Sequence, residues 1–443
     1  MSFARYPKYK DSGVEWLGEV PEQWRSAPIK RVGRLQGGAG FPHEYQGVEG
    51  AELPFHKVNA IGQADREGIL GPGSNTVSRE TAKDLGAFVF PPSSIVFAKV
   101  GAALLLGRIR RVDRDCCIDN NMMGLVVGGE GFDHRYIAYA MTLVRFDLIA
   151  NPGTVPSLNE GQIGDFCLPI PSISEQEDIS AFLDRETAKI DALVGEQQRL
   201  IELLKEKRQA VLSHAVTKGL NRAAAMKPSG IEWLGDVPAH WEVRRLKNVL
   251  KEPLKYGANE PAELDDRAFP RFIRITDIDD FGGLKDETFK SLPVEVAQPF
   301  LLEDGDVLLA RSGATVGKSF IYSAQWGIAC FAGYLIRARL QTTACLPMWL
   351  YYYCQTNEYW DYVVGTQIQS TIQNVSAEKY SNLNLPLPPR AEQTTIVAFL
   401  DVETAKLDTL IAEAQRAIDL LQERRTALIS AAVTGQIDVR NLV

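Results

Sequence analysis

The chain has 443 residues, of which 45% are hydrophobic and 23% are charged, with a formal net charge of −8. This composition is typical of a soluble globular protein, and the length predicts two to four domains. The acidic balance argues against a simple nucleic-acid binder, so the distribution of the charges has to be examined.

Several classes of site are not expected. The chain shows no signal peptide and no apolar run long enough to cross a bilayer, so we expect a cytoplasmic protein without membrane contact. Six cysteines without CxxC spacing indicate reduced thiols, mostly buried. Five scattered histidines form no Cys/His cluster, so we expect no metal site.

The chain repeats itself. Residues 12–18, Ser-Gly-Val-Glu-Trp-Leu-Gly, return 217 residues later as 229–235, Ser-Gly-Ile-Glu-Trp-Leu-Gly. A repeat of this length predicts a tandem duplication with halves of about 217 residues. We expect the Trp and Leu side chains of these openings to pack the start of each domain.

The middle of each half is less alike and is rich in short β-like runs broken by Gly, Pro and Asn. Three landmarks survive in both halves. Lys57–Ile61 matches Arg274–Ile278 as a strand-like run at the same offset of 217, and Ala98–Ala102 matches Ala310–Ala314 at 212. Leu-Pro-x-Pro bridges at 168–171 and 385–388 predict domain boundaries, because proline cannot sit inside the helix that follows.

A helical segment follows each bridge, beginning at Glu175-Gln176 and Glu392-Gln393 and ending before Gly219 and Gly435. Apolar positions spaced three and four residues apart form a heptad seam, which predicts that the two helices pack on each other within one chain. The seam positions are Ile190, Leu193, Gln197, Leu200, Leu204 and Val211, with counterparts Leu407, Leu410, Ala414, Ala417, Leu421 and Leu428.

No catalytic constellation is found. Residues 313–319, Gly-Ala-Thr-Val-Gly-Lys-Ser, imitate a phosphate-binding P-loop, but only three residues separate the glycines and a strand-like run follows. We therefore expect no nucleotide site there and no enzymatic activity in this chain.

The charge distribution is more informative than its sum. Residues 94–114 carry five basic residues against one acid, and residues 306–339 carry four against Asp306. A basic stretch at matching positions of both middles predicts contact with phosphates. Arginine bonds guanine bidentately and asparagine suits adenine. The candidate DNA contacts are Lys57, Asn59, Lys99, Arg108, Arg110, Arg274, Thr276, Asp277, Arg311, Ser312 and Lys318.

Over its whole length, the chain resembles the specificity subunit of type I restriction–modification enzymes. The resemblance is carried by the order of the openings, the landmarks, the bridges and the Phe-Leu-Asp-x-Glu-Thr-Ala-Lys segments at 182–189 and 399–406. The resemblance implies an α+β fold with pseudo-two-fold symmetry. Two β-rich target-recognition domains (1–171 and 226–388) would each be followed by a spacer helix (172–225 and 389–443), the helices forming an antiparallel coiled coil.

The resemblance also implies a role and partners. Each domain would read one half of a split, asymmetric double-stranded DNA site, and a helix from about Glu186 to Val216, roughly 45 Å long, would space them. The chain would dock two methyltransferase subunits and, in the complete enzyme, restriction/translocase subunits. It would bind no cofactor itself, since S-adenosylmethionine, ATP and magnesium belong to the partners.

Three alternatives remain open at this point. A recognition subunit of a related system that cuts on both sides of its site would share this organisation. A protein–protein scaffold with peptide-binding β-rich domains would also contain paired helices, although the two basic stretches disfavour it. An enzyme with an unrecognised site is disfavoured because the halves share no titratable cluster.

Overall fold

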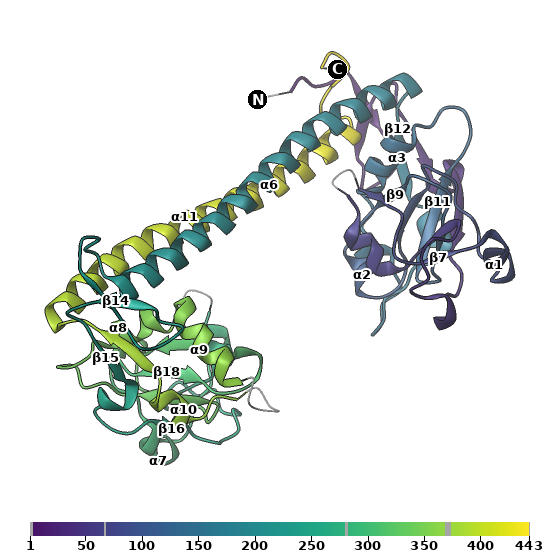
Figure 1. Cartoon of the computed structure of the whole chain (residues 1–443). Coiled ribbons are helices and arrows are strands. Elements are labelled where there is room, and N and C mark those ends of the chain that lie inside the picture. The colour runs from purple at the N-terminus through teal and green to yellow at the C-terminus, as the bar shows by residue number, and fades with distance from the viewer. Residues whose placement is uncertain (1–2, 66–67, 280–281, 368–373, 443) are drawn as a thin grey trace. The chain divides into compact units, whose positions relative to one another are not determined.

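The computed structural model describes residues 3–65, 68–279, 282–367 and 374–442. The chain divides into two compact units, unit 1 with residues 1–197 and 416–443, and unit 2 with residues 198–415. Two long helices, α6 (Ile173–Lys218) and α11 (Arg390–Val433), each contribute to both units (Figure 1). The helices begin within one residue of the predicted boundaries 172 and 389, but the compact units divide inside both helices rather than at their ends.

Unit 1 is built on a five-stranded sheet in the order β4-β11-β8-β9-β6, in which only β6 and β9 are parallel. A three-stranded sheet, β10-β5-β7, contains the parallel pair β5 and β10. The strands of unit 1 are β1 (Tyr9–Asp11), β2 (Glu19–Pro21), β3 (Arg25–Pro28), β4 (Gly33–Gly37), β5 (Leu53–His56), β6 (Ile69–Leu70), β7 (Thr76–Val77), β8 (Ile95–Ala98), β9 (Arg110–Val112), β10 (Cys117–Ile118), β11 (Met122–Val127) and β12 (Cys167–Ile170).

Short helices complete unit 1. They are α1 (Arg79–Asp84), α2 (Ala102–Leu105), α3 (His134–Met141), α4 (Phe146–Ile149) and α5 (Glu160–Gly164), with 3-10 turns η1 (Ile29–Arg31), η2 (His43–Tyr45) and η3 (Val58–Gln63). The main core joins the sheet to both ends of the chain. Trp24 is fully buried in it with Phe182 of α6 and Val433 of α11.

Unit 2 is built on a four-stranded antiparallel sheet, β16-β21-β18-β19, beside the parallel pair β17 and β20. Its strands are β13 (Met226–Pro228), β14 (Asp236–Pro238), β15 (Glu242–Arg245), β16 (Lys255–Tyr256), β17 (Arg271–Ile273), β18 (Val307–Ala310), β19 (Ser319–Ile321), β20 (Ala329–Phe331), β21 (Leu335–Ala338) and β22 (Asn384–Leu387).

The helices of unit 2 are α7 (Val294–Ala297), α8 (Pro347–Tyr353), α9 (Asn357–Gln367) and α10 (Ala377–Ser381). Its 3-10 turns are η4 (Leu246–Asn248), η5 (Ile275–Asp277), η6 (Asp286–Thr288), η7 (Gln298–Phe300), η8 (Gly313–Thr315) and η9 (Ala324–Trp326). Trp241 and Trp349 meet edge to face in the main core at 5.7 Å, together with Leu212 of α6 and Leu400 of α11.

The strand pairings of the two units correspond. In unit 1 Arg25 pairs with Ile170 across β3 and β12, and in unit 2 Glu242 pairs with Leu387 across β15 and β22, each residue 217 positions later. The β1–β2 pair and the β13–β14 pair are related by the same offset. The sequence repeat is therefore accompanied by matching local structure.

A buried glutamine fastens the start of each long helix. The side chain of Gln176 donates to the carbonyls of Gly131 and Pro171, and its oxygen accepts from the N–H of Asp133. Gln393 donates to the carbonyls of Ala344 and Pro388 and accepts from the N–H of Leu346. These bonds satisfy backbone groups that burial would otherwise leave unpaired.

The two long helices also contact each other. In unit 1 Arg425 of α11 donates to Asp191 of α6 at 3.0 Å, and in unit 2 Arg208 of α6 donates to Asp408 of α11 at 2.8 Å. Glycines follow the helices as predicted, with Gly219 and Gly435 at positive φ. No helix in the described part of the chain is both long enough and apolar enough to span a membrane.

The predicted seam is only partly correct. Ile190, Leu204 and Leu407 are buried, and Val211, Ala417, Leu421 and Leu428 are partly buried. Leu193, Leu200 and Leu410 are instead exposed; Leu200 is 43% exposed, whereas its neighbour Ile201 is 9% exposed. A strict seven-residue pattern drifts by about 20° per heptad around a 3.6-residue helix, so it does not follow one face for long.

The landmarks at 57–61 and 274–278 were wrongly predicted as strands. Both lie in 3-10 turns, η3 and η5, which directly follow the parallel strands β5 and β17. The β-branched residues of these runs favour a strand, but each strand has already ended before the run and the backbone turns there. The P-loop imitation behaves as predicted, because η8 leads into strand β19 rather than into a helix.

Candidate nucleic-acid interface

Each unit contains a short loop whose backbone hydrogen bonds join two segments that are repeated in the sequence. We call it the central loop; it comprises residues 119–121 in unit 1 and 332–334 in unit 2. In unit 1 the N–H of Asp119 donates to the carbonyl of His56, and the N–H of Lys99 donates to the carbonyl of Asn121. In unit 2 Ala332 donates to Ile273, and Arg311 donates to Tyr334. The central loop thus holds the residue after strand β8 or β18 close to the turn after β5 or β17.

A glycine lies against each central loop, at a position where no side chain would fit. A Cβ on Gly38 would lie 2.1 Å from the carbonyl oxygen of Asp119, and a Cβ on Gly257 would lie 2.3 Å from that of Ala332. These distances are far below a van der Waals contact. The same close approach therefore shapes both loops.

In unit 1 the structure brings the predicted contact residues together around η3. Lys57 precedes η3 and Asn59 lies on it, exposed to solvent. Arg110 donates to the carbonyls of Ile61 and Ile109, and an Nη of Arg108 lies 3.2 Å from the Cβ position of Gly62. Burial and the neighbouring Arg108 charge lower the pKa of Arg110.

Lys57 and Lys99 both act on the carboxyl group of Asp119, which is buried in the central loop. Burial raises the pKa of Asp119, while hydrogen bonds from the N–H groups of Asn121 and Val58 and the charges of Lys57 and Lys99 lower it. Lys57 also donates to the amide oxygen of Gln46 at 2.9 Å. Lys99 lies over Gly37 of β4, with Nζ 3.1 Å from the Cβ position of that glycine.

In unit 2 the η5 turn carries Arg274, Thr276 and Asp277. Arg274 donates twice to the Asp277 carboxylate, at 3.0 and 2.6 Å, and once to the carbonyl of Thr288. Asp277 is 1% exposed, whereas Thr276 is exposed. Arg274 and Asp277 therefore satisfy each other, and Thr276 is the residue of this turn that faces solvent.

The remaining predicted residues of unit 2 lie between β18 and β19. Arg311 follows β18, Ser312 pairs with Asn374, and Lys318 is exposed before β19. The guanidinium carbon of Arg311 lies 4.8 Å from the centre of the Tyr256 ring. Of these three residues, Arg311 is bonded to the central loop 332–334, through its N–H and the carbonyl of Tyr334.

The basic stretch of residues 306–339 is less available than its sequence suggests. Arg337 and Arg339 are bound to Glu252, Glu303 and Asp306, and they lie within the unit with little exposure. They stabilise the sheet rather than offering charge to a ligand. In unit 1 Arg114 is likewise paired, with Asp113.

Three central-loop residues were not predicted from the sequence. Asn120 and Asn121 are exposed in unit 1, and Tyr334 is 70% exposed in unit 2. Tyr256, under Arg311, was missed as well. The sequence contains a signal for these positions. An offset of 213 aligns Asn121 with Tyr334, and each residue lies between two buried strands.

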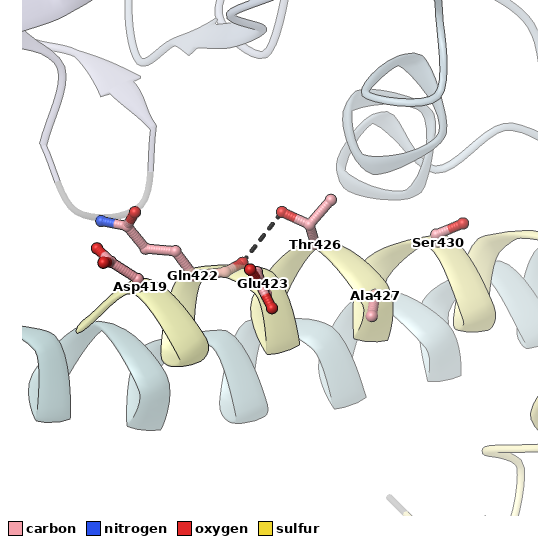
Figure 2. Close-up of a pocket in the computed structure, with 6 residues that line it drawn as sticks. All are labelled: Asp419, Gln422, Glu423, Thr426, Ala427 and Ser430. Carbon is pink, nitrogen blue, oxygen red and sulfur yellow. Dashed lines mark hydrogen bonds between the residues drawn. The ribbon is translucent and has the colours of Figure 1, made fainter. Parts of the chain in front are cut away.

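The long helix α11 carries a different kind of surface. A hollow lies along this helix, and Figure 2 shows the residues that line it: Asp419, Gln422, Glu423, Thr426, Ala427 and Ser430. Thr426 donates to the carbonyl of Gln422 at 3.1 Å. The lining contains two acids and no basic residue, which is the wrong charge for DNA phosphates. Among the described residues, no group of His, Cys, Asp and Glu is arranged to hold a metal ion.

Comparisons with known proteins show which proteins this chain is similar to. The family model of the type I restriction modification DNA specificity domain matches residues 238–418. The StySPI specificity subunit of Salmonella potsdam is 24% identical over 436 residues, covering 95% of this chain and 90% of that protein. The EcoKI specificity subunit of Escherichia coli K12 is 21% identical, with the same shares of both chains covered.

A solved structure concerned with complex assembly and conformational transition of the type I R-M system contains a similar chain. It matches 94% of this chain and 98% of its own length, with a TM-score of 0.68 and 17% identity, which shows the fold. The resemblance indicated by the duplicated motifs is thus confirmed: over nearly its whole length, this chain is similar to the specificity subunits of type I restriction enzymes.

Proposed function

We propose that this chain is the non-catalytic specificity subunit of a type I restriction–modification complex and that it recognises a bipartite, asymmetric DNA site. The observation that carries the proposal is the pair of central-loop sites. They share a backbone frame, but they present different side chains, with Lys57, Lys99 and two asparagines in unit 1 and Arg311 and Tyr334 in unit 2. Two readers of different chemistry on one frame suit two different half-sites.

The charge available at these sites supports contact with DNA. Arg108 and Lys318 are exposed, and Lys99 and Arg311 are half-buried. No ion pair involving any of these four cations is found in the described residues. Free cations of this kind contact phosphates or base edges, whereas paired ones contribute less.

We further propose that α6 and α11 form an intramolecular antiparallel coiled coil that spaces the two readers in a pseudo-two-fold repeat. Support comes from the contacts that each unit makes separately, Asp191 with Arg425 in unit 1 and Arg208 with Asp408 in unit 2. The residue numbers rise along α6 as they fall along α11, which is the order expected of antiparallel helices.

The partners follow from the same proposal. Two methyltransferase subunits and the restriction subunits would dock on this chain, and S-adenosylmethionine, ATP and magnesium would act on those subunits. The acidic hollow of α11 is suited to a protein partner rather than to DNA.

The test is DNA selection with the chain and its methyltransferase partner present, using a randomised duplex library. We expect enrichment of two short, different sequence blocks separated by a fixed gap. Omitting the chain should remove the enrichment. A complex that binds every duplex equally would contradict the proposal and favour a protein–protein scaffold.

A further inference from the structure

The arginines around the central loop of unit 2 differ in how far their donors are already used. Arg274 already donates from Nε and Nη2 to Asp277 and Thr288, and Arg339 binds Glu303 and Asp306. For Arg311 no side-chain hydrogen bond or ion pair is found within the described part of the chain. Among these three arginines, Arg311 is therefore the one with the fewest side-chain donors engaged by the described residues.

The direction of those donors is restricted. The Nε of Arg311 is buried and has no hydrogen-bond partner among the described residues, and the residue as a whole is half-buried. A ligand can therefore approach only the terminal nitrogens, Nη1 and Nη2. Two parallel N–H groups at the end of a guanidinium match the O6 and N7 acceptors that guanine presents in the major groove.

Tyr256 fixes the plane of this guanidinium. The Arg311 guanidinium carbon lies 4.8 Å from the ring centre, which is a cation–π contact. The ring is itself held, because its hydroxyl accepts a hydrogen bond of 3.0 Å from the N–H of Ala377. A side chain oriented before binding loses less entropy when it forms two hydrogen bonds at once.

Unit 1 lacks this arrangement at the equivalent position. Lys99 takes the place of Arg311 after its strand, and Gly37 takes the place of Tyr256 beneath it. A lysine ammonium is a point charge without a fork, and a glycine offers no ring. The difference is therefore one of recognition chemistry, not only of residue identity.

We propose that Arg311, held on the Tyr256 ring, reads a guanine in the half-site contacted by unit 2, and that Tyr256 is its positioning residue. This inference rests on the proposed function. It names one base, one half of the site and the pair of side chains that determines specificity there.

The experiment measures binding of the complete complex to duplexes in which every position of both half-sites is changed to each of the four bases. Arg311→Lys retains the charge and loses the fork. We expect it to reduce discrimination at a single guanine by about ten- to a hundredfold. Tyr256→Ala should reduce discrimination at the same base, whereas Tyr256→Phe, which keeps the ring, should retain most of it.

Two matched variants serve as controls. Arg267→Ala removes an exposed arginine of unit 2 that is paired with Asp286, and it should leave the guanine preference intact. Lys99→Ala should act only on the other half-site. Urea unfolding of unit 2 reports whether each unit 2 variant is folded, and preference in the unit 1 half-site reports that the complex still binds DNA.

The outcomes separate this inference from the proposed function. Uniform weakening by Arg311→Lys across all sequences would identify a phosphate contact and overturn the inference. An unchanged preference in both Arg311→Lys and Tyr256→Ala would overturn it as well, while leaving the specificity-subunit function intact. A wild-type complex without any sequence preference would overturn both.

Discussion

The two central-loop sites share a backbone and differ in how their side chains are held. In unit 1 Lys57 is bonded to a neutral amide, Gln46, and Lys99 lies over Gly37. In unit 2 Arg274 is paired with a buried carboxylate, and Arg311 lies on an aromatic ring. The comparison teaches that the frame is set by backbone contacts, so the side chains on it can diverge without changing the fold.

The frame itself should be the most sensitive part of both units. Gly257→Ala places a Cβ 2.3 Å from the carbonyl oxygens of Phe331 and Ala332, which belong to a paired strand and its loop and cannot easily move. We expect unit 2 to lose about 3 kcal/mol of unfolding free energy and its half-site to lose sequence preference. Urea unfolding and the base-substitution binding assay measure the two effects.

Gly38→Ala should do the same to unit 1 and its half-site alone, because that Cβ would lie 2.1 Å from the Asp119 carbonyl. Gly40→Ala is the matched control, since no heavy atom of the described residues lies within 4 Å of its Cβ position. If Gly38→Ala and Gly40→Ala behaved alike, the close approach would not shape the loop.

The next largest effect separates Arg274 from Lys57, which occupy equivalent positions. Arg274→Ala leaves the Asp277 carboxylate buried and without its cation, and we expect it to lower the free energy of unfolding by about 2 kcal/mol. This loss is below the usual cost of breaking a fully buried pair, because Arg274 is 30% exposed. Lys57→Ala removes a bond to a neutral amide and should cost about 0.5 kcal/mol. Denaturant unfolding of both variants measures the difference, and equal losses would contradict the assigned roles.

A further predicted effect concerns acid sensitivity and again distinguishes the units. Burial lowers the pKa of His56 in unit 1 to about 4, while the equivalent residue of unit 2 is Ile273. Between pH 6.5 and 4 the folded state binds fewer protons than the unfolded state. The contribution of His56 is therefore complete above pH 6.5 and is lost as the pH falls, by about 1–2 kcal/mol at pH 5.

Unfolding of unit 1 by urea at pH 7 and pH 5, followed by mass spectrometry of pulse-labelled peptides, measures this loss. His56→Ile copies the residue of unit 2 and should remove most of the difference between the two pH values. An equal acid loss in the variant would assign the sensitivity to other groups.

The order of the domains and long helices could be predicted from the sequence because the same motifs recur at a fixed offset. The repeat at an offset of 217 located the starts of both long helices to within two residues. The proline bridges, predicted as domain boundaries, form the strands β12 and β22. Local geometry was harder to predict. The turn at 57–61 follows a strand and contains apolar residues, so its composition resembles a strand although its backbone is a 3-10 turn.

The candidate sites were predicted in part for a similar reason. Basic residues are visible in a sequence, but their partners come from distant positions. Arg339 and Asp306 are 33 residues apart in the sequence and 2.6 Å apart in space, so this charge is neutralised. Tyr256 lies 55 residues from Arg311, and only the pairing of β16 with β21 and of β21 with β18 brings the two together.

The most direct test of the central claim is methylome sequencing of cells that contain the modification partner, with and without this chain. Two readers of different chemistry on one frame predict a methylated motif that depends on the chain, is split by a fixed gap and has two unrelated halves. A palindromic or ungapped motif, or a methylome that does not change when the chain is removed, would contradict the account.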